Sequence, residues 1–237
     1  MSVSERRASA RTAVVWEALE PVLAGGPLDV LDIGGGTGGF AVRVAELGHR
    51  VTVVDPSPDA LAALSRRARE VGVEVAGVQG DLSTLLEVAA PGAADVVLCH
   101  GVLEVVDDPA AATATIRQVL RPGGTLSLLV AQRHAAVVAR AMAGHFGQAL
   151  ELLEQQAPAT ARTGHRFTSA ELATLLVDAG FEVVSTHAVR VFADLVPGSL
   201  LDLEPGATGA LVELERAVAD RPEYLPLATQ VHVIATA

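Results

Sequence analysis

The chain lacks several residue types that mark particular classes of protein. It has 237 residues but a single cysteine, Cys99, which excludes an internal disulfide and a CxxC zinc site. We therefore expect a protein of a reducing compartment, the cytoplasm. The first 24 residues contain no uninterrupted apolar segment of the kind found in signal peptides. No stretch approaches the roughly 18 consecutive apolar residues of a spanning helix, so we expect no membrane partner.

Lysine and asparagine are absent, and aromatic residues make up only 3% of the chain. All 17 cationic side chains are therefore arginines, and the formal net charge is −11. An acidic chain is not attracted as a whole to phosphate backbones, so a nucleic acid partner would need a local arginine patch. The histidines show neither HxH nor HExxH spacing, and we expect no metal site.

Short apolar runs alternate with helical stretches, which is typical of a parallel sheet covered by helices on both faces. We expect strands at residues 28–33, 50–55, 73–79, 94–100, 125–131, 181–192 and 229–236, the last two antiparallel. Helices are expected at 12–24, 38–48, 58–72, 82–89, 109–120, 168–179 and near 209–220, with one or two more in 134–156 and a loop at 157–167.

The pattern predicts one α/β domain over residues 1–237. It is a Rossmann-like, seven-stranded, mostly parallel sheet with an antiparallel edge pair, helices on both faces and a helical insert after strand five. We expect residues 1–27 to place a helix over a bound cofactor. We expect residues 132–167 to form the insert, which could act as a lid.

The strongest functional signal is VLDIGGGTGG, residues 30–39. A buried strand leads into a tight glycine turn and then a helix, where the backbone can approach a ligand without intervening Cβ atoms. Gly34, Gly36 and Gly39 also satisfy the GxGxxG spacing of dinucleotide-binding folds, so spacing alone leaves that alternative open. A purely structural turn is the third interpretation.

Asp32 separates these interpretations. At the approach to the turn, its carboxylate would repel a pyrophosphate but attract the ammonium group of an aminoacyl ligand. With Asp32 the run reads D-x-G-x-G-x-G, which favours S-adenosylmethionine as the cofactor.

Two further acids follow strands. Asp55, next to Pro56, can accept hydrogen bonds from both ribose hydroxyls; the alternative is a helix N-cap, a role that Ser57 or Asp59 could also fill. Asp81 can accept from the adenine amine while the N–H of Leu82 reaches a ring nitrogen, and the alternative is again an N-cap.

His100 ends the fourth strand, at the edge where ligands of open α/β sheets bind. It could contact the methionine part of the cofactor or the substrate, or it could pack beneath the next helix. Its neighbour Cys99 reads as a small buried strand residue, because no base accompanies it.

These motifs, in this order, resemble the class I S-adenosylmethionine-dependent methyltransferases. Over almost the whole chain, the sequence also resembles the bacterial tRNA 5-carboxymethoxyuridine methyltransferases, which esterify a carboxylate on a modified wobble uridine. The resemblance lies in RTAVVW (11–16), HGVLEV (100–105), LRPGGTLSL (120–128), AVRVF (188–192) and VHV (231–233). One departure is APATARTGHR (157–166), which stands where that family has a lysine-rich run.

The resemblance implies that Arg11 binds the carboxylate of the cofactor's methionine moiety, in place of being an exposed helix arginine. Arg190, the only formal charge in VSTHAVRVF, becomes the candidate for an acceptor carboxylate, the alternative being a solvent-facing side chain. Arg166 and His134 would help to position the acceptor.

A carboxylate acceptor is already ionised at neutral pH, so we expect no general base; the protein would align and desolvate the reactants. Two other functions remain open. The chain could be an O- or N-methyltransferase of small molecules with the insert as a lid, or a cofactor-binding partner protein without turnover.

Overall fold

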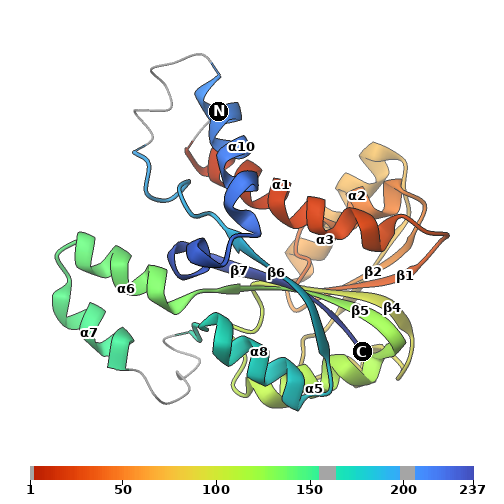
Figure 1. Ribbon diagram of the computed structural model, residues 1–237. Helices are drawn as coiled ribbons and strands as arrows, with labels where there is room; N and C mark the ends of the chain where they lie inside the picture. Colours follow the sequence, from red (N-terminus) through yellow and green to blue (C-terminus); the bar gives the residue numbers. More distant parts are fainter. Residues whose placement is uncertain (1–2, 155–163, 198–205) are drawn as a thin grey trace.

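The structure is a computed structural model that describes residues 3–154, 164–197 and 206–237. Seven strands form one sheet in the order β3-β2-β1-β4-β5-β7-β6 (Figure 1). The strands are β1 (Asp29–Ile33), β2 (Arg50–Asp55), β3 (Val75–Gln79), β4 (Ala94–His100), β5 (Leu120–Ala131), β6 (Glu182–Val189) and β7 (Gln230–Thr236). The first five strands are parallel, whereas β7 runs antiparallel to both β5 and β6. The predicted sheet is therefore confirmed.

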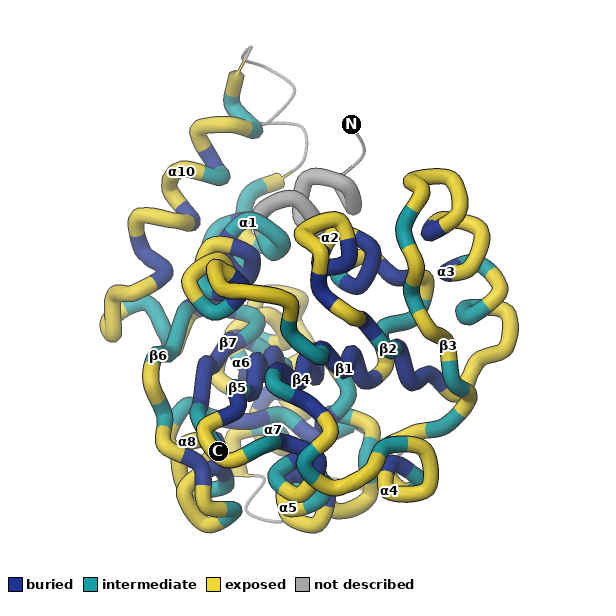
Figure 2. Tube along the Cα trace, turned by 90° about the vertical axis from the view of Figure 1, so that its right-hand side faces the viewer, coloured by how far each residue is buried: buried dark blue, intermediate teal, exposed yellow. Residues whose placement is uncertain are grey.

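Helices cover both faces of this sheet. Those described are α1 (Val3–Leu23), α2 (Ala41–Glu46), α3 (Pro58–Val71), α4 (Leu85–Val88), α5 (Pro109–Val119), α6 (Arg133–Met142), α7 (Phe146–Glu154), α8 (Ser169–Asp178) and α10 (Ala207–Ala219), with a 3-10 helix η1 at Pro222–Leu227. One apolar core packs α1, α2 and α3 against the sheet, and a second packs α4, α5 and α8 against the other face. Figure 2 shows the central strands buried between these two layers.

Local sequence explains where several helices begin and end. Ser57 caps α3 by accepting a hydrogen bond from the N–H of Ala60, and the left-handed Gly72 ends that helix. Asp108 caps α5, and a capping box of Thr168 and Glu171 opens α8.

Some predicted boundaries were wrong. The first helix begins at Val3 instead of residue 12. The fifth strand begins at Leu120 because the Arg-Pro-Gly-Gly segment continues along β4 with a register shift between Ala94 and Val96. The sixth strand ends at Val189, since the next residue, Arg190, has φ +62°.

The insert after β5 consists of two helices, α6 and α7, which Figure 1 shows side by side at the end of the sheet to which β5 leads. The bridge from Gln132 to Phe167 closes its base. Most of the loop predicted at residues 157–167, including Arg162, lies outside the described residues. Among the helices that the structure describes, none is long and apolar enough to cross a membrane.

Candidate active site

A cavity of about 710 Å³ lies at the carboxyl ends of β1, β2 and β4. Strand ends, the glycine turn and the start of α5 supply its walls, which include Ile33, Gly34, Asp55, Pro56, Asp81, Leu82, His100, Val102, Val106 and Ala112. Ligands of open α/β sheets bind at this edge, outside the carboxyl ends of the strands. Six of the predicted site residues therefore meet in one cavity: Gly34, Asp55, Pro56, Asp81, Leu82 and His100.

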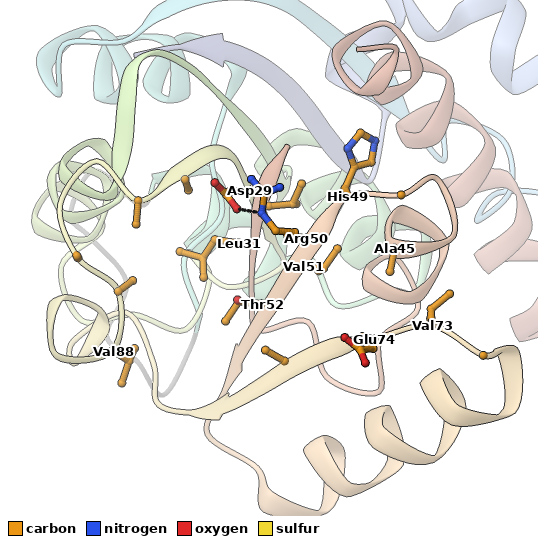
Figure 3. Close-up of a pocket in the computed structure, with 18 residues that line it drawn as sticks. Asp29, Leu31, Ala45, His49, Arg50, Val51, Thr52, Val73, Glu74 and Val88 are labelled. Atoms are coloured by element: carbon orange, nitrogen blue, oxygen red, sulfur yellow. Dashed lines mark hydrogen bonds and ion pairs between the residues drawn. The ribbon is translucent and has the colours of Figure 1, made fainter. Parts of the chain in front are cut away.

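A second cavity of about 710 Å³ lies at the opposite edge of the sheet, where β1, β2 and β4 begin (Figure 3). Two of its charged residues, Asp29 and Arg50, pair with each other. Arg50 binds Asp29 with 2.6 Å between Nε and Oδ1, and Arg121 binds both Asp29 and Asp95. These pairs tie the amino ends of adjacent strands together, and their arginines hold the pKa of Asp29 at about 2. We assign this cavity no role in the reaction.

The glycine turn needs its glycines for different reasons. Gly34 has φ +67°, its N–H donates to the carbonyl of Val54 (2.7 Å), and a Cβ there would lie 2.5 Å from Val102. Gly36 has φ +55°, but a Cβ at this position would have Asp55 Oδ2 as its nearest neighbour, 3.9 Å away. The turn is therefore closed on the protein side at Gly34 and open at Gly36, which leaves room for a ligand.

Asp32 lies beneath this turn. Only 3% of it is exposed, and its carboxylate packs against Gly35. Burial, together with the charge of Asp55, raises the pKa of Asp32 to about 7. A cation placed above the turn would stabilise its ionised form, which agrees with the ammonium partner predicted from the sequence.

Asp55 supports the turn from the end of β2. Its Oδ2 accepts from the N–H of Gly36 and its Oδ1 from the N–H of Ser57, both at 2.9 Å. Ser57 is the residue that caps α3, so Asp55 is not needed for that purpose. Each carboxylate oxygen keeps a further lone pair for a ligand hydroxyl.

Asp81 forms a local turn but is not the helix N-cap that was its alternative, because Thr84 holds that position before α4. Its Oδ1 accepts from the N–H and hydroxyl of Ser83 (2.8 and 2.6 Å), and these bonds lower the pKa of Asp81. Asp81 still lines the cavity beside the buried Leu82. This turn and a contact with a ligand are compatible, since the carboxylate has a second oxygen.

His100 is partly buried at the cavity wall, edge-on to Phe40 with ring centroids 5.0 Å apart. Burial and the charge of Arg11 lower the pKa of His100 to about 3, so the ring is neutral. Its neighbour Cys99 is fully buried, and burial raises the pKa of that thiol, which confirms a packing role.

Burial lowers the pKa of Arg11, and the positive charge of nearby Arg190 lowers it further. Arg190 donates to Asp194 Oδ1 (2.5 Å), and its left-handed backbone is held by Thr229, which binds the carbonyl of Arg190. Among the described residues, the Nε atoms of both arginines are buried without a hydrogen-bond partner. Arg190 is already paired with Asp194, and each arginine keeps one unused donor for an anionic ligand.

The remaining candidates lie beyond β4 and β5. His134 is exposed in the first turn of α6. The positive charge of Arg166 stabilises the ionised carboxylate of Glu104, a residue that we did not single out from the sequence. Glu104 Oε1 accepts from the N–H of Ala131 (2.7 Å), Oε2 is buried without a partner among the described residues, and burial raises the pKa of Glu104. Its position within HGVLEV was the available signal.

In the part of the chain that the structure describes, no three His, Cys, Asp or Glu side chains gather into a metal site. The donor set of the cavity is instead that of an organic cation with a nucleoside. It has carboxylates for hydroxyls, an apolar wall and a buried acid below the turn, and the charge of Arg11 reaches its lining residue His100.

Comparison with known proteins agrees with this site. Residues 31–128 match the family model described as a methyltransferase domain. A methyltransferase from Burkholderia thailandensis, solved with 1,6-didemethyltoxoflavin and S-adenosylhomocysteine, has a TM-score of 0.59 at 24% identity over 97% of this chain and 78% of that one. A methyltransferase from Methanosarcina mazei has a TM-score of 0.63 at 20% identity, covering 91% and 96% of the two chains. The chain belongs to the class I S-adenosylmethionine-dependent methyltransferases, and S-adenosylmethionine is its cofactor.

Within that class, one likeness extends along the whole chain. The tRNA 5-carboxymethoxyuridine methyltransferase of Escherichia coli (strain K12) is 32% identical over 95% of this chain and 87% of its own length. The ubiquinone biosynthesis O-methyltransferase of Xanthomonas euvesicatoria is 35% identical, but over only 48% of each chain. The methyltransferase predicted from the glycine motif is therefore confirmed.

Proposed function

We propose that this enzyme transfers a methyl group to the carboxylate of a carboxymethoxyuridine at the wobble position of tRNA. The observation that carries the proposal is the pair Arg11 and Arg190, each with a buried Nε donor that has no partner among the described residues. The likeness over 95% of the chain to a tRNA 5-carboxymethoxyuridine methyltransferase supports it. A tRNA substrate would place the enzyme in the cytoplasm.

In this proposal, different described residues bind different parts of the cofactor. Gly34 and Gly36 let it approach the sheet, Asp55 binds the ribose hydroxyls beside Pro56, and Asp81 with Leu82 binds the adenine. Asp32, His100 and Arg11 face its aminoacyl part, with Arg11 on the carboxylate. Residues 1–27 would then lie over the cofactor as part of a single domain, residues 1–237.

Arg190 binds the acceptor carboxylate, and Arg166 and His134 contact the rest of the acceptor. The cofactor supplies a methyl group on a positively charged sulfur. Because the acceptor carboxylate is already ionised, the chain needs no general base. Its contribution is to align the two reactants and exclude water. The lowered pKa makes His100 a weak base, and burial keeps Cys99 a thiol, which agrees with a reaction that needs neither as a base or nucleophile.

The test is methylation of total tRNA from a strain that lacks this gene, with labelled cofactor. A base-labile methyl ester on tRNA supports the proposal. The matched variant is Arg190→Asn, since asparagine tolerates a left-handed backbone but cannot bind the carboxylate. Absence of label on tRNA known to contain the carboxylated nucleoside would reject the acceptor, although not the methyltransferase activity.

One observation favours a second acceptor class, small molecules methylated on oxygen or nitrogen. The insert of α6 and α7 exposes large apolar side chains, including Met142 (71%) and Phe146 (72%), and the chain carries a net charge of −11. An apolar insert over residues 132–167 would serve as a lid on a hydrophobic acceptor. Labelled products from metabolite pools, with none on tRNA, would identify this function. Cofactor binding without turnover on either acceptor would indicate a partner protein.

A further inference from the structure

A line of polar side chains crosses the sheet from the cavity to the opposite side of the molecule. His100, Ser127, His232 and His187 come from β4, β5, β7 and β6, which are neighbours in the sheet. His100 Nε2 lies 2.8 Å from Ser127 Oγ, and the same oxygen lies 2.8 Å from His232 Nε2. His232 Nδ1 lies 3.3 Å from His187 Nδ1. The four side chains therefore form one continuous hydrogen-bonded line.

The two ends of this line carry opposite charge. At one end, His187 Nε2 lies 3.4 Å from Asp220 Oδ1. The negative charge of Glu17 on α1 also favours the protonated form of His187. His187 lines a cleft formed by α1, β6 and α10. Arg216 lines the same cleft but is paired with Glu17 and Glu213. At the other end, His100 lines the cofactor cavity, and the positive charge of Arg11 lowers its pKa.

The histidines within the line are neutral. Burial lowers the pKa of His187, although Asp220, the backbone carbonyl of His232 and Glu17 act in the opposite direction. Burial also lowers the pKa of His232, which His100 and His187 lower further. A neutral imidazole has one N–H donor and one acceptor nitrogen, so each ring must choose one of two tautomers.

The charge at the Asp220 end favours one choice. The negative charge of Asp220, 3.4 Å from Nε2, favours the tautomer of His187 that is protonated on Nε2, which leaves its Nδ1 to accept from His232. His232 Nε2 then accepts from the hydroxyl of Ser127. Ser127 in turn accepts from the Nε2–H of His100, and the Nδ1 of His100 is left without a proton.

We propose that Asp220, His187, His232 and Ser127 are positioning residues that fix the tautomer of His100, so that its Nδ1 accepts a hydrogen bond from the ammonium group of the bound methyl donor. The proposal rests on the placement of the cofactor given above. No side chain among the described residues occupies that Nδ1. The opposite tautomer would set an N–H against the ammonium N–H groups, so binding of the aminoacyl part depends on the order of the whole line.

The tautomer can be measured directly in the ligand-free protein. The nitrogen-15 chemical shifts of the imidazole rings distinguish protonated from unprotonated nitrogens, and His100→Gln identifies the His100 signals by their loss. We expect His100 to be protonated on Nε2 and unprotonated on Nδ1. In His232→Phe, which keeps a ring of similar size but removes both nitrogens, we expect a mixture of the two tautomers. A wild-type His100 protonated on Nδ1 would overturn the proposal.

Calorimetry with two ligands tests the consequence. S-adenosylhomocysteine carries the ammonium group, whereas 5′-methylthioadenosine lacks the entire aminoacyl part. We expect Ser127→Ala and His232→Phe to weaken binding of S-adenosylhomocysteine by about 3- to 10-fold, part of the value of a hydrogen bond to a charged group. Binding of methylthioadenosine should not change.

The control is His49→Phe, which alters another buried histidine at the opposite edge of the sheet and should affect neither ligand. Equal weakening of both ligands in the Ser127 and His232 variants would show general damage and reject the proposal, and unchanged binding of S-adenosylhomocysteine would reject it as well. Neither experiment uses a methyl acceptor, so both are independent of the tRNA assay.

Discussion

Asp55 Oδ2 accepts a hydrogen bond from the backbone N–H of Gly36 at 2.9 Å, which joins the end of β2 to the glycine turn that follows β1. The bond crosses from one strand to its neighbour at the edge where the cavity opens. The acid that is proposed to bind the ribose therefore also sets the conformation of the turn beside it.

Substitutions of glycines in the turn should distinguish an effect on cofactor binding from an effect on folding stability. Gly36→Ala places a methyl group where the nearest protein atom is 3.9 Å away, so we expect a stability loss of only about 1 kcal/mol, from the left-handed backbone. The same methyl group blocks the approach of the cofactor, and the affinity for S-adenosylhomocysteine should fall about 10-fold or more.

Gly38→Ala is the matched comparison. Gly38 has φ +80°, and its Cβ would collide with the side chain of the buried Leu64. We expect a stability loss of about 2–3 kcal/mol by denaturant unfolding. If Gly36→Ala destabilised the protein as much as Gly38→Ala, the turn would not be open at Gly36.

Asp32 should make the stability of the ligand-free protein depend on pH. Its pKa is about 7 in the folded state against an ordinary value of 3.8. Between these values the folded state holds a proton that the unfolded state releases, so stability falls as pH rises through this window. In Asp32→Asn the fall should be shallower, as measured by Tm from pH 4 to 8. Curves that stay parallel for the two proteins would contradict the raised pKa.

Glu215 should anchor the segment that presents Arg190. It is fully buried on α10, and its two oxygens accept from the N–H groups of Val191, Phe192 and Ala193 at 2.7–2.9 Å. Glu215→Gln removes the charge and turns an amide donor toward these donors, so we expect a loss of about 2–4 kcal/mol. Glu213→Gln, exposed on the same helix, should stay within about 0.5 kcal/mol.

Arg190→Asn should impair methyl transfer to the acceptor without impairing binding of the methyl donor. Asparagine adopts φ near +60° more readily than other side chains, so the local backbone should persist. We expect methyl transfer to the tRNA carboxylate to fall about 100-fold, since a bidentate charged interaction is lost, while S-adenosylhomocysteine binding changes less than about 3-fold. A parallel loss of both would move Arg190 to the cofactor side.

The sequence predicted the parts of the site that local patterns determine. The strand, turn and helix from Asp29 to Glu46 follow from an apolar run ended by glycines. Ser57 caps α3, so Asp55 does not fill the N-cap role that was its alternative. The positions of Asp55, Asp81 and His100 at strand ends then follow from the rule that parallel strands share one carboxyl edge.

Features that depend on contacts between distant segments could not be predicted in this way. Glu215 looks like an exposed helix acid, and only the fold buries it against residues 191–193. The line from His100 to His187 exists because β7 inserts between β5 and β6, an order that periodicity does not reveal. The left-handed Arg190 likewise depends on Thr229, which is far away in the sequence.

The central claim is that the cavity at the glycine turn holds the methyl donor with Asp55 on its ribose. Titration calorimetry of S-adenosylhomocysteine into the wild-type protein and into Asp55→Ala tests it most directly. Loss of charge-assisted hydrogen bonds to the ribose predicts an affinity reduced by about 10- to 100-fold, in a variant that is still folded. An Asp55→Ala protein that binds as tightly as the wild type would contradict the account.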